Sequence, residues 1–253
     1  MKSVNTLCKY LTWDSTFFNI RIAQVKKNYL SGTELKQCIR WCKKQKITCL
    51  YFLIDPASVK SISLAESSGF HFVDMRVILE ANLNENIFRN MQLKSAMQSV
   101  RESTQKELAA IKKIAGKNHY QTRFFKDKRF PPSKSSKLYE LWIEQGFENP
   151  RGIVLIAPIE NRIAGYFVGQ VDENHTAKIV LAGVDEEFRK KGIGTALVCA
   201  GLQWFKKKSA KKTIVVTQGT NIPAMRLYTS WGFYPREAML WYHRWFLSGN
   251  ASE

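Results

Sequence analysis

Residues 184–197 read VDEEFRKKGIGTAL, and this stretch decides the fold. It reads as the end of a strand, a short polar turn, and an apolar helix that begins within the pair Gly192 and Gly194. The first amide N–H groups of a helix have no partners within the helix and carry the positive end of its dipole. Glycines let a pyrophosphate approach that backbone closely. The stretch therefore predicts a helix start that binds a phosphate group.

Two widespread phosphate-binding motifs do not fit this stretch. Leu197 occupies the position of the third glycine in the dinucleotide-binding motif, and no Gly-Lys-Ser/Thr of a P-loop occurs in the chain. The predicted helix start is therefore neither a P-loop nor a dinucleotide fingerprint.

Strands and helices are predicted on both sides of this stretch. A capping box of Thr104 and Glu107 begins a helix that ends near Gly116. A second helix follows, with Leu138, Leu141 and Trp142 on one face. The remaining elements are strands at 153–157, 162–170 and 177–184, a helix at 193–207, a strand at 213–217, a helix at 222–230 and a strand at 239–245.

The first part of the chain predicts a smaller α/β unit. Its expected elements are a strand at 20–25, a helix at 33–44, a strand at 49–54, a helix at 58–68 and a strand at 70–79. The order strand, Asp55-Pro56, helix, Gly69-Phe70, strand parallels a second set around Asn221 and Gly232-Phe233. Residues 81–97 are polar and have no clear period. We therefore expect domains at 1–90 and 98–247.

Composition indicates a globular protein. The 253 residues are 45% hydrophobic, and no apolar run approaches the ~18 to 20 residues of a membrane span. The first ten residues have no apolar run long enough for a signal peptide, so a soluble, cytoplasmic protein is expected. The five cysteines include no close CxxC pair, and we expect them to be reduced and mostly buried, with no metal site.

The net charge of +18 comes from 39 Lys+Arg against 21 Asp+Glu. It is compatible with attraction to polyanions such as nucleic acid, or with a solvated lysine-rich surface. No nucleic-acid-binding motif accompanies the charge, so a nucleic-acid partner is not expected.

The glycine motif becomes more informative together with a second motif. Arg189-x-x-Gly192-x-Gly194 resembles the acetyl-CoA pyrophosphate loop of the GNAT superfamily of N-acetyltransferases. Asn221, Tyr228 and the Gly232-Phe233 pair stand where that superfamily has its second hallmark. The resemblance implies an α/β GNAT fold, with a mixed central sheet flanked by helices, preceded by a smaller half-GNAT-like α/β domain. The cofactor-binding residues that it implies are Leu181, Ala182, Gly183, Val184, Arg189, Lys190, Lys191, Gly192, Ile193, Gly194, Thr195 and Asn221.

A narrower resemblance extends over nearly the whole chain. Residues 11–18, 69–74, 122–124, 138–144 and 217–228 are similar to bacterial dTDP-fucosamine acetyltransferases. These enzymes acetylate the amine of a nucleotide-linked 4-amino-4,6-dideoxy sugar, and a small N-terminal domain helps to shape their acceptor site. The resemblance implies the same substrate class here. The strong positive charge and the short polar tail depart from that family.

The resemblance also implies a direct attack of a neutral amine on the acetyl thioester. Tyr228 matches the general acid of the family, and backbone N–H groups near 181–183 would stabilise the developing oxyanion. Asp74 matches the base that acts through water, although relatives can carry Glu there. Asn221 either bonds the pantetheine amide or only caps the helix. A nucleoside diphosphate would suit the basic, aromatic segment that includes Arg123, Arg129 and Tyr139, as would a solvent-exposed lid. His71 and His119 are expected to be structural.

Two other functions stay open at this point. The first is a GNAT acetyltransferase that acts on a protein N-terminus or a lysine. The second is a non-catalytic GNAT-fold module that uses its charge to bind an anionic partner. A homodimer is also possible.

Overall fold

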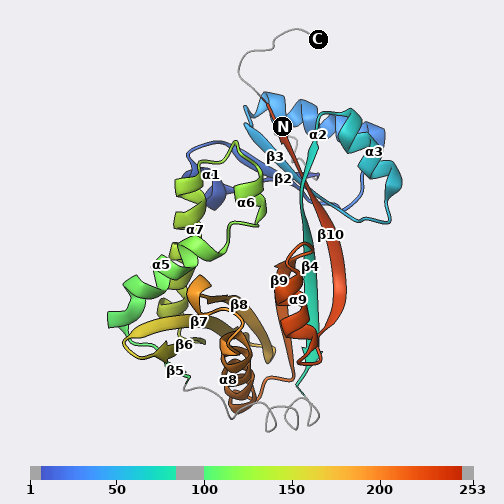
Figure 1. The fold of residues 1–253 in the computed structure, drawn as a ribbon. Coiled ribbons are helices and arrows are strands. Elements are labelled where there is room, and N and C mark those ends of the chain that lie inside the picture. Colours follow the sequence, from blue (N-terminus) through green and yellow to red (C-terminus); the bar gives the residue numbers. More distant parts are fainter. Residues whose placement is uncertain (1–6, 84–99, 247–253) are drawn as a thin grey trace. The chain divides into compact units, whose positions relative to one another are not determined.

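The computed structural model describes residues 7–83 and 100–246 (Figure 1). Contacts within the chain divide it into two compact units. Unit 1 comprises residues 1–76, 126–130 and 238–253, and unit 2 comprises residues 77–125 and 131–237. The chain therefore passes between the units four times, and the strands β4 (His71–Asn82) and β10 (Tyr234–Trp245) have residues in both.

Unit 1 is a small α/β unit. Its other elements are β1 (Cys8–Tyr10), α1 (Thr12–Phe18), β2 (Ile22–Val25), α2 (Gly32–Lys44), β3 (Cys49–Ile54) and α3 (Val59–Ser67). β2 runs antiparallel to β1 and parallel to β3, and β3 pairs antiparallel with the end of β10. Apolar residues of α2 and β3, including Leu35, Cys38 and Phe52, are fully or almost fully buried and form the core. A capping box of Ser31 and Glu34 begins α2.

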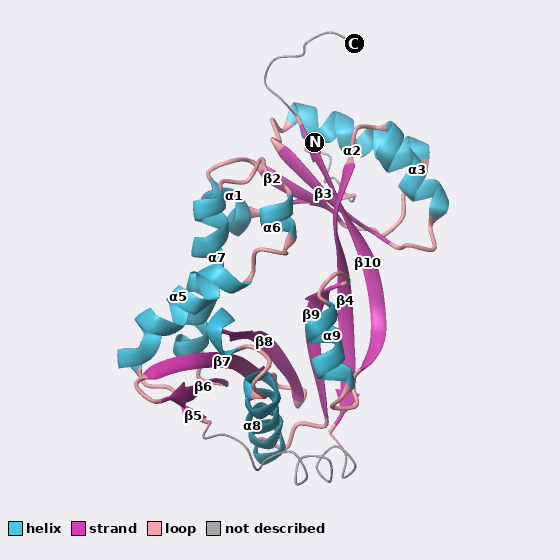
Figure 2. Ribbon diagram, viewed as in Figure 1, coloured by secondary structure: helices cyan, strands magenta, loops and turns pink. Residues whose placement is uncertain are grey.

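Unit 2 contains a mixed sheet with helices against it (Figure 2). Its further elements are β5 (Arg101–Glu102), η2 (Gln105–Glu107), α5 (Leu108–Asn118), α6 (Arg123–Lys126), α7 (Pro132–Glu148), β6 (Gly152–Ile159), β7 (Arg162–Val171), β8 (Thr176–Val184), η3 (Glu186–Phe188), α8 (Ile193–Lys207), β9 (Lys212–Gln218) and α9 (Ile222–Thr229). The strand order is β10-β4-β9-β8-β7-β6-β5. Strands β5 to β8 pair antiparallel in turn, whereas β8 and β9 are parallel.

Each predicted helix and strand corresponds to an element of the structure, but β1, α1 and α6 were not predicted. β3 and α8 have the predicted bounds, and all five cysteines are buried and free of disulfides. The expected linker at 81–97 lies almost wholly outside the described residues, and β4 continues to Asn82. The helix α1 and strand β1 had no periodic signal because both are short. None of the described helices is long and apolar enough to cross a membrane.

The boundaries of the two units differ from those of the predicted domains, 1–90 and 98–247. The end of β10 belongs to unit 1 because six of its residues pair with β3, from Leu240 with Ile54 to Trp245 with Cys49. Residues 126–130 belong there because buried Asp127 accepts hydrogen bonds from His243 Nδ1 at 2.7 Å and Trp245 Nε1 at 2.8 Å. Burial opposes the charge of this carboxylate, but these hydrogen bonds lower the pKa of Asp127.

A substitution at Gly201 of α8 tests the packing of unit 2. A Cβ at Gly201 would lie 2.2 Å from Cζ of Phe167, a fully buried residue of β7. Moving the ring in a packed core costs about 1–3 kcal/mol, and alanine returns about 1 kcal/mol of helix propensity. Because an approach of 2.2 Å demands a large movement, we expect Gly201→Ala to lower the free energy of unfolding by a net value of about 1–2 kcal/mol. Urea denaturation measures the change.

Gly116→Ala is the matched control for this substitution. The nearest atom to the Cβ added at Gly116 would be a carboxylate oxygen of Glu140, at 3.3 Å, and this flexible side chain can move away. The free energy of unfolding should therefore stay the same or rise. Equal stability of Gly201→Ala and the native protein would contradict the described packing.

Candidate functional site

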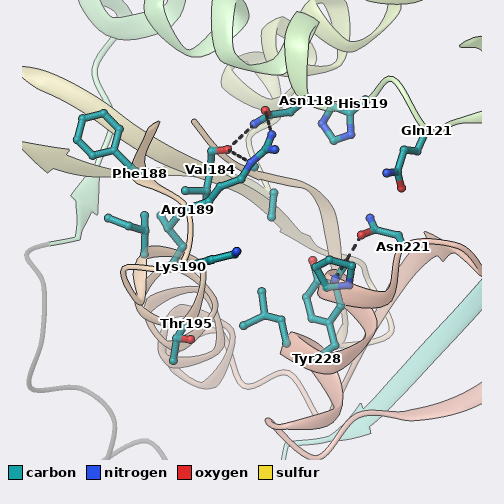
Figure 3. A pocket seen from close by; sticks show the side chains of 18 of the residues that line it. Asn118, His119, Gln121, Val184, Phe188, Arg189, Lys190, Thr195, Asn221 and Tyr228 are labelled. Carbon is teal, nitrogen blue, oxygen red and sulfur yellow. Dashed lines mark hydrogen bonds between the residues drawn. The ribbon is translucent and has the colours of Figure 1, made fainter. Parts of the chain in front are cut away.

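A pocket of about 510 Å³ lies within unit 2 (Figure 3). Its walls come from the end of α5 and the following loop, the end of β8, the loop into α8, the end of β9, and α9. The sequence predicted ligand-binding and catalytic residues at the end of β8, in the loop into α8 and in α9 with its N-cap, but not at the end of α5 or in the loop after it.

The start of α8 forms one wall of the pocket. Gly192 is its N-cap residue, with a φ of 79°, and no side chain in the described part of the chain caps the first amides of the helix. A φ in this range favours glycine. Lys190 also has a positive φ, of 63°, and lies in the same wall. Uncapped amides at a helix start, with a lysine beside them, fit a phosphate group.

The separation of β8 from β9 opens the pocket between them. The two strands pair from Thr176 with Lys212 to Ile179 with Val215, and no described pair follows, although β8 continues to Val184 and β9 to Gln218. The register of β8 against β7 shifts at the same level, between Val168 and Gly169. Backbone groups at the end of β8 are thereby left without partners on β9, and such groups can bind a ligand.

Tyr228 of α9 also lines the pocket. It is 5% exposed, and its ring packs against Phe233 with centroids 5.4 Å apart. Burial raises the pKa of Tyr228, so its hydroxyl stays protonated at neutral pH. No hydrogen bond joins this hydroxyl to another described residue, which leaves it able to donate to a ligand.

Asn221 caps the start of α9. Its Oδ1 accepts a hydrogen bond from the amide of Ala224 at 3.3 Å (Figure 3). The capping role weighed in the sequence analysis is therefore present, and Asn221 lines the pocket as well.

Asn118, at the end of α5, is a site residue that sequence reasoning missed. Its Oδ1 accepts from Arg189 Nη2 at 2.9 Å, and its Nδ2 donates to the carbonyl of Val184 at 3.0 Å (Figure 3). The amide therefore links the loop before α8 to the end of β8. No local motif marks Asn118, because its partners lie about seventy residues further along the chain.

His119 lines the pocket next to Asn118 and is held on two sides. Its Nε2 lies 2.8 Å from the hydroxyl of fully buried Tyr166, and its ring stacks on Tyr139 at 4.4 Å. Burial lowers the pKa of His119 to about 4, so the ring is neutral at pH 7. Tyr139 donates its own hydroxyl to Thr122 at 2.7 Å, so it supports the pocket wall from behind.

The structure brings most of the predicted site residues together. Those that line the pocket are Ala182, Gly183, Val184, Arg189, Lys190, Gly192, Ile193, Gly194, Thr195, Asn221 and Tyr228. Leu181 is buried and Lys191 is exposed, and neither is part of the lining.

Asp74 lies in unit 1, where it is 3% exposed. Its Oδ1 is 2.6 Å from Nζ of Lys126 in an ion pair. Protonating this carboxylate must therefore break the pair with an ammonium group.

The neutral state of His119 predicts a dependence of stability on pH. Its pKa is about 4 in the folded state and about 6.5 when unfolded, so the unfolded state binds the proton more tightly. Stability is then fully present above pH 6.5 and is lost as the pH falls toward 4. Between pH 7 and pH 5 we expect a loss of about 2 kcal/mol that His119→Gln lacks. Urea denaturation of both proteins at the two pH values measures it, and equal losses would contradict the assignment.

Comparison with curated proteins gives matches over part of the chain. The mycothiol acetyltransferase of Arthrobacter sp. (strain FB24) is 26% identical over 113 residues, which cover 43% of this chain and 33% of that protein. The spore coat polysaccharide biosynthesis protein SpsD of Bacillus subtilis (strain 168) is 21% identical over 136 residues, covering 54% of this chain and 47% of that protein. The chain thus spans between a third and a half of the length of these two relatives.

Solved structures match over nearly the whole chain. A GCN5-related N-acetyltransferase from Sphaerobacter thermophilus aligns with a TM-score of 0.67 and 14% identity, over 94% of this chain and 76% of that one. A conserved protein of unknown function from Staphylococcus epidermidis ATCC 12228 aligns with a TM-score of 0.69 and 14% identity, over 94% and 90%. At these identities the likeness concerns the fold.

The pocket-forming part of the chain also matches a family profile. The match runs from Asn118 to Phe233, so it begins at the residue that anchors Arg189 and ends beyond Tyr228. The chain has the GNAT fold, and its residues 118–233 match the acetyltransferase (GNAT) family.

Proposed function

We propose that the protein is an acetyl-CoA-dependent N-acetyltransferase. One observation carries the proposal: a single pocket combines an uncapped helix start, the open edge of β8 and a protonated Tyr228. Acetyl-CoA would supply an acetyl thioester, from which a neutral amine takes the acetyl group while the thiol leaves.

Each wall of the pocket has a part in this reaction. Amides at the start of α8, with Lys190 and Arg189, would hold the pyrophosphate, because positive charge and free N–H groups meet there. Backbone N–H groups at the end of β8 would stabilise negative charge on the carbonyl oxygen. The Tyr228 hydroxyl would donate a proton or a hydrogen bond to the leaving sulfur of coenzyme A. A comparable thiol, that of free cysteine, has a pKa of about 8.5, so the sulfur leaves more readily when it is partly protonated.

We propose the amine of a nucleotide-linked 4-amino-4,6-dideoxy sugar as the acceptor. The resemblance to dTDP-fucosamine acetyltransferases over both halves of the chain supports it, as does a relative named for polysaccharide biosynthesis. A cytoplasmic location goes with this proposal. The relatives named mycothiol acetyltransferase likewise favour a small molecule over a protein N-terminus or lysine.

The acceptor can be identified by the release of free thiol from acetyl-CoA. The acceptor panel would contain nucleotide-linked 4-amino sugars, other amino sugars, polyamines and lysine peptides. Saturable turnover with the nucleotide amino sugars alone is the expected result. Turnover with peptides alone would contradict the proposed acceptor. No thiol release with any acceptor, combined with tight binding of an anionic partner, would favour the non-catalytic module.

Tyr228→Phe tests the proton donor. The ring packing against Phe233 is kept, so only the hydroxyl is lost. We expect kcat to fall by about 10²-fold to 10⁴-fold with little change in KM for acetyl-CoA. Tyr234→Phe is the matched control, since Tyr234 is 45% exposed and bonds to Glu80 outside the pocket lining. An unchanged kcat in Tyr228→Phe would remove the hydroxyl from the mechanism.

Asp74→Asn and Lys126→Met together test the proposed base. Both substitutions break the ion pair of 2.6 Å, but only the first removes the carboxylate. A base at Asp74 predicts that Asp74→Asn lowers kcat by about 10²-fold or more, while Lys126→Met keeps at least a tenth of the native value. Equal losses in the two variants would show that the pair only holds residues 126–130 in unit 1.

A further inference from the structure

A second hollow in unit 2 adjoins the pocket described above. It encloses about 430 Å³ between α5 with η2, the turn between β6 and β7, and Asp185. Its lining meets that of the pocket at two places. Lys117 of the hollow precedes Asn118 of the pocket, and the guanidinium of Arg162 lies over the ring of Phe188 at 4.8 Å.

The hollow has an apolar wall and a basic rim. Ala110, Lys113, Ile114 and Lys117 recur at helical spacing, so they share one face of α5. Ile163, from the start of β7, adds to the apolar part. The basic side chains of the lining are Lys106, Lys113, Lys117 and Arg162.

The two acidic side chains of the lining already have partners. Glu107 accepts from Arg101 Nη2 at 2.5 Å and from the amide of Thr104 at 2.8 Å. Asp185 accepts from the amide of Glu187 at 3.2 Å.

The lysines, in contrast, keep most of their charge uncompensated. No ion pair or hydrogen bond joins Lys106, Lys113 or Lys117 to a carboxylate of the described residues. Arg162 pairs with Glu187 at 2.7 Å, and both Arg162 and the nearby Lys117 lower the pKa of that exposed carboxyl. The hollow therefore attracts anions even with Glu187 at its rim.

The basic rim beside apolar residues suits a ligand that joins a phosphate to an apolar ring. We propose that this hollow binds the 3′-phosphoadenosine end of coenzyme A, with the base on the apolar wall and the 3′-phosphate at Lys113 and Lys117. This inference rests on the proposed function, which places the pyrophosphate at the start of α8. The pyrophosphate and the 3′-phosphate are carried by the same ribose, so the two neighbouring sites would be filled by one molecule.

Calorimetric titration with coenzyme A and with 3′-dephospho-coenzyme A tests the assignment without an acceptor. In the native protein we expect the dephospho compound to bind about tenfold more weakly, because charged contacts to the 3′-phosphate are lost. In the double variant Lys113→Ala/Lys117→Ala this difference should shrink to less than about twofold, with the affinity for the dephospho compound unchanged. Both lysines are exposed on a helix, so the variant should fold normally.

The double variant Lys207→Ala/Lys211→Ala is the matched control. It removes the same charge from exposed positions of the same unit, outside the hollow, and should keep the tenfold difference. Added salt should reduce the difference in the native protein and in the control, but not in the Lys113/Lys117 variant. A native protein that binds both compounds equally, or a Lys113/Lys117 variant that keeps the difference, would overturn the assignment.

Two further outcomes separate this inference from its alternatives. Adenosine 3′,5′-bisphosphate should compete with coenzyme A. If it binds while coenzyme A saturates the protein, the hollow is an independent nucleotide site and the assignment is wrong. If the native protein binds neither coenzyme A nor the dephospho compound, the proposed function itself fails. If it binds both with equal affinity, only the assignment of the hollow fails.

Discussion

The separation of β8 from β9 beyond Ile179 and Val215 is the constraint on which the rest of the site depends. A continuous parallel pair would use the backbone groups of both strands and leave no room between them. Because pairing stops there, the last three residues of β8, Ala182 to Val184, border the pocket, and the loop that follows can begin α8 at its rim. The fold thus provides binding groups from the main chain, and few side chains need to be specialised.

The end of α5 stabilises this open arrangement from the side. Asn118 joins Arg189 to the carbonyl of Val184, and His119 holds the hydroxyl of Tyr166. Tyr166 in turn fills the space over Gly183, where a Cβ would lie 2.9 Å from the phenolic oxygen. His119, Tyr166 and Tyr228 are all kept neutral by burial. Of these, His119 and Tyr228 line the pocket, so neutral polar side chains border it together with Arg189 and Lys190.

Much of this arrangement could be predicted from the sequence, because its signals are local. The apolar run of β3 and the glycines at the start of α8 predicted the first and last residues of these two elements correctly. Asn118 and His119 could not be found in this way, since their partners are reached only through the fold. The pairing of Asp74 with Lys126, fifty-two residues away, was hidden for the same reason. The ends of β4 and β10 depend on partner strands, which local propensity does not reveal.

The path of β4 and β10 has a consequence for how this chain can be divided. Within the sheet, β4 lies between β10 and β9, although in the sequence it comes before most of the linker predicted at residues 81–97. A fragment that begins after that stretch would keep β9 and β10 but lose the strand between them. One edge of β9 and both edges of β10 would then be unpaired, because β3, the other partner of β10, is lost as well. Such edges promote aggregation. The two halves of the sequence are therefore not separable building blocks: recombination or truncation at this point would cut through a shared sheet.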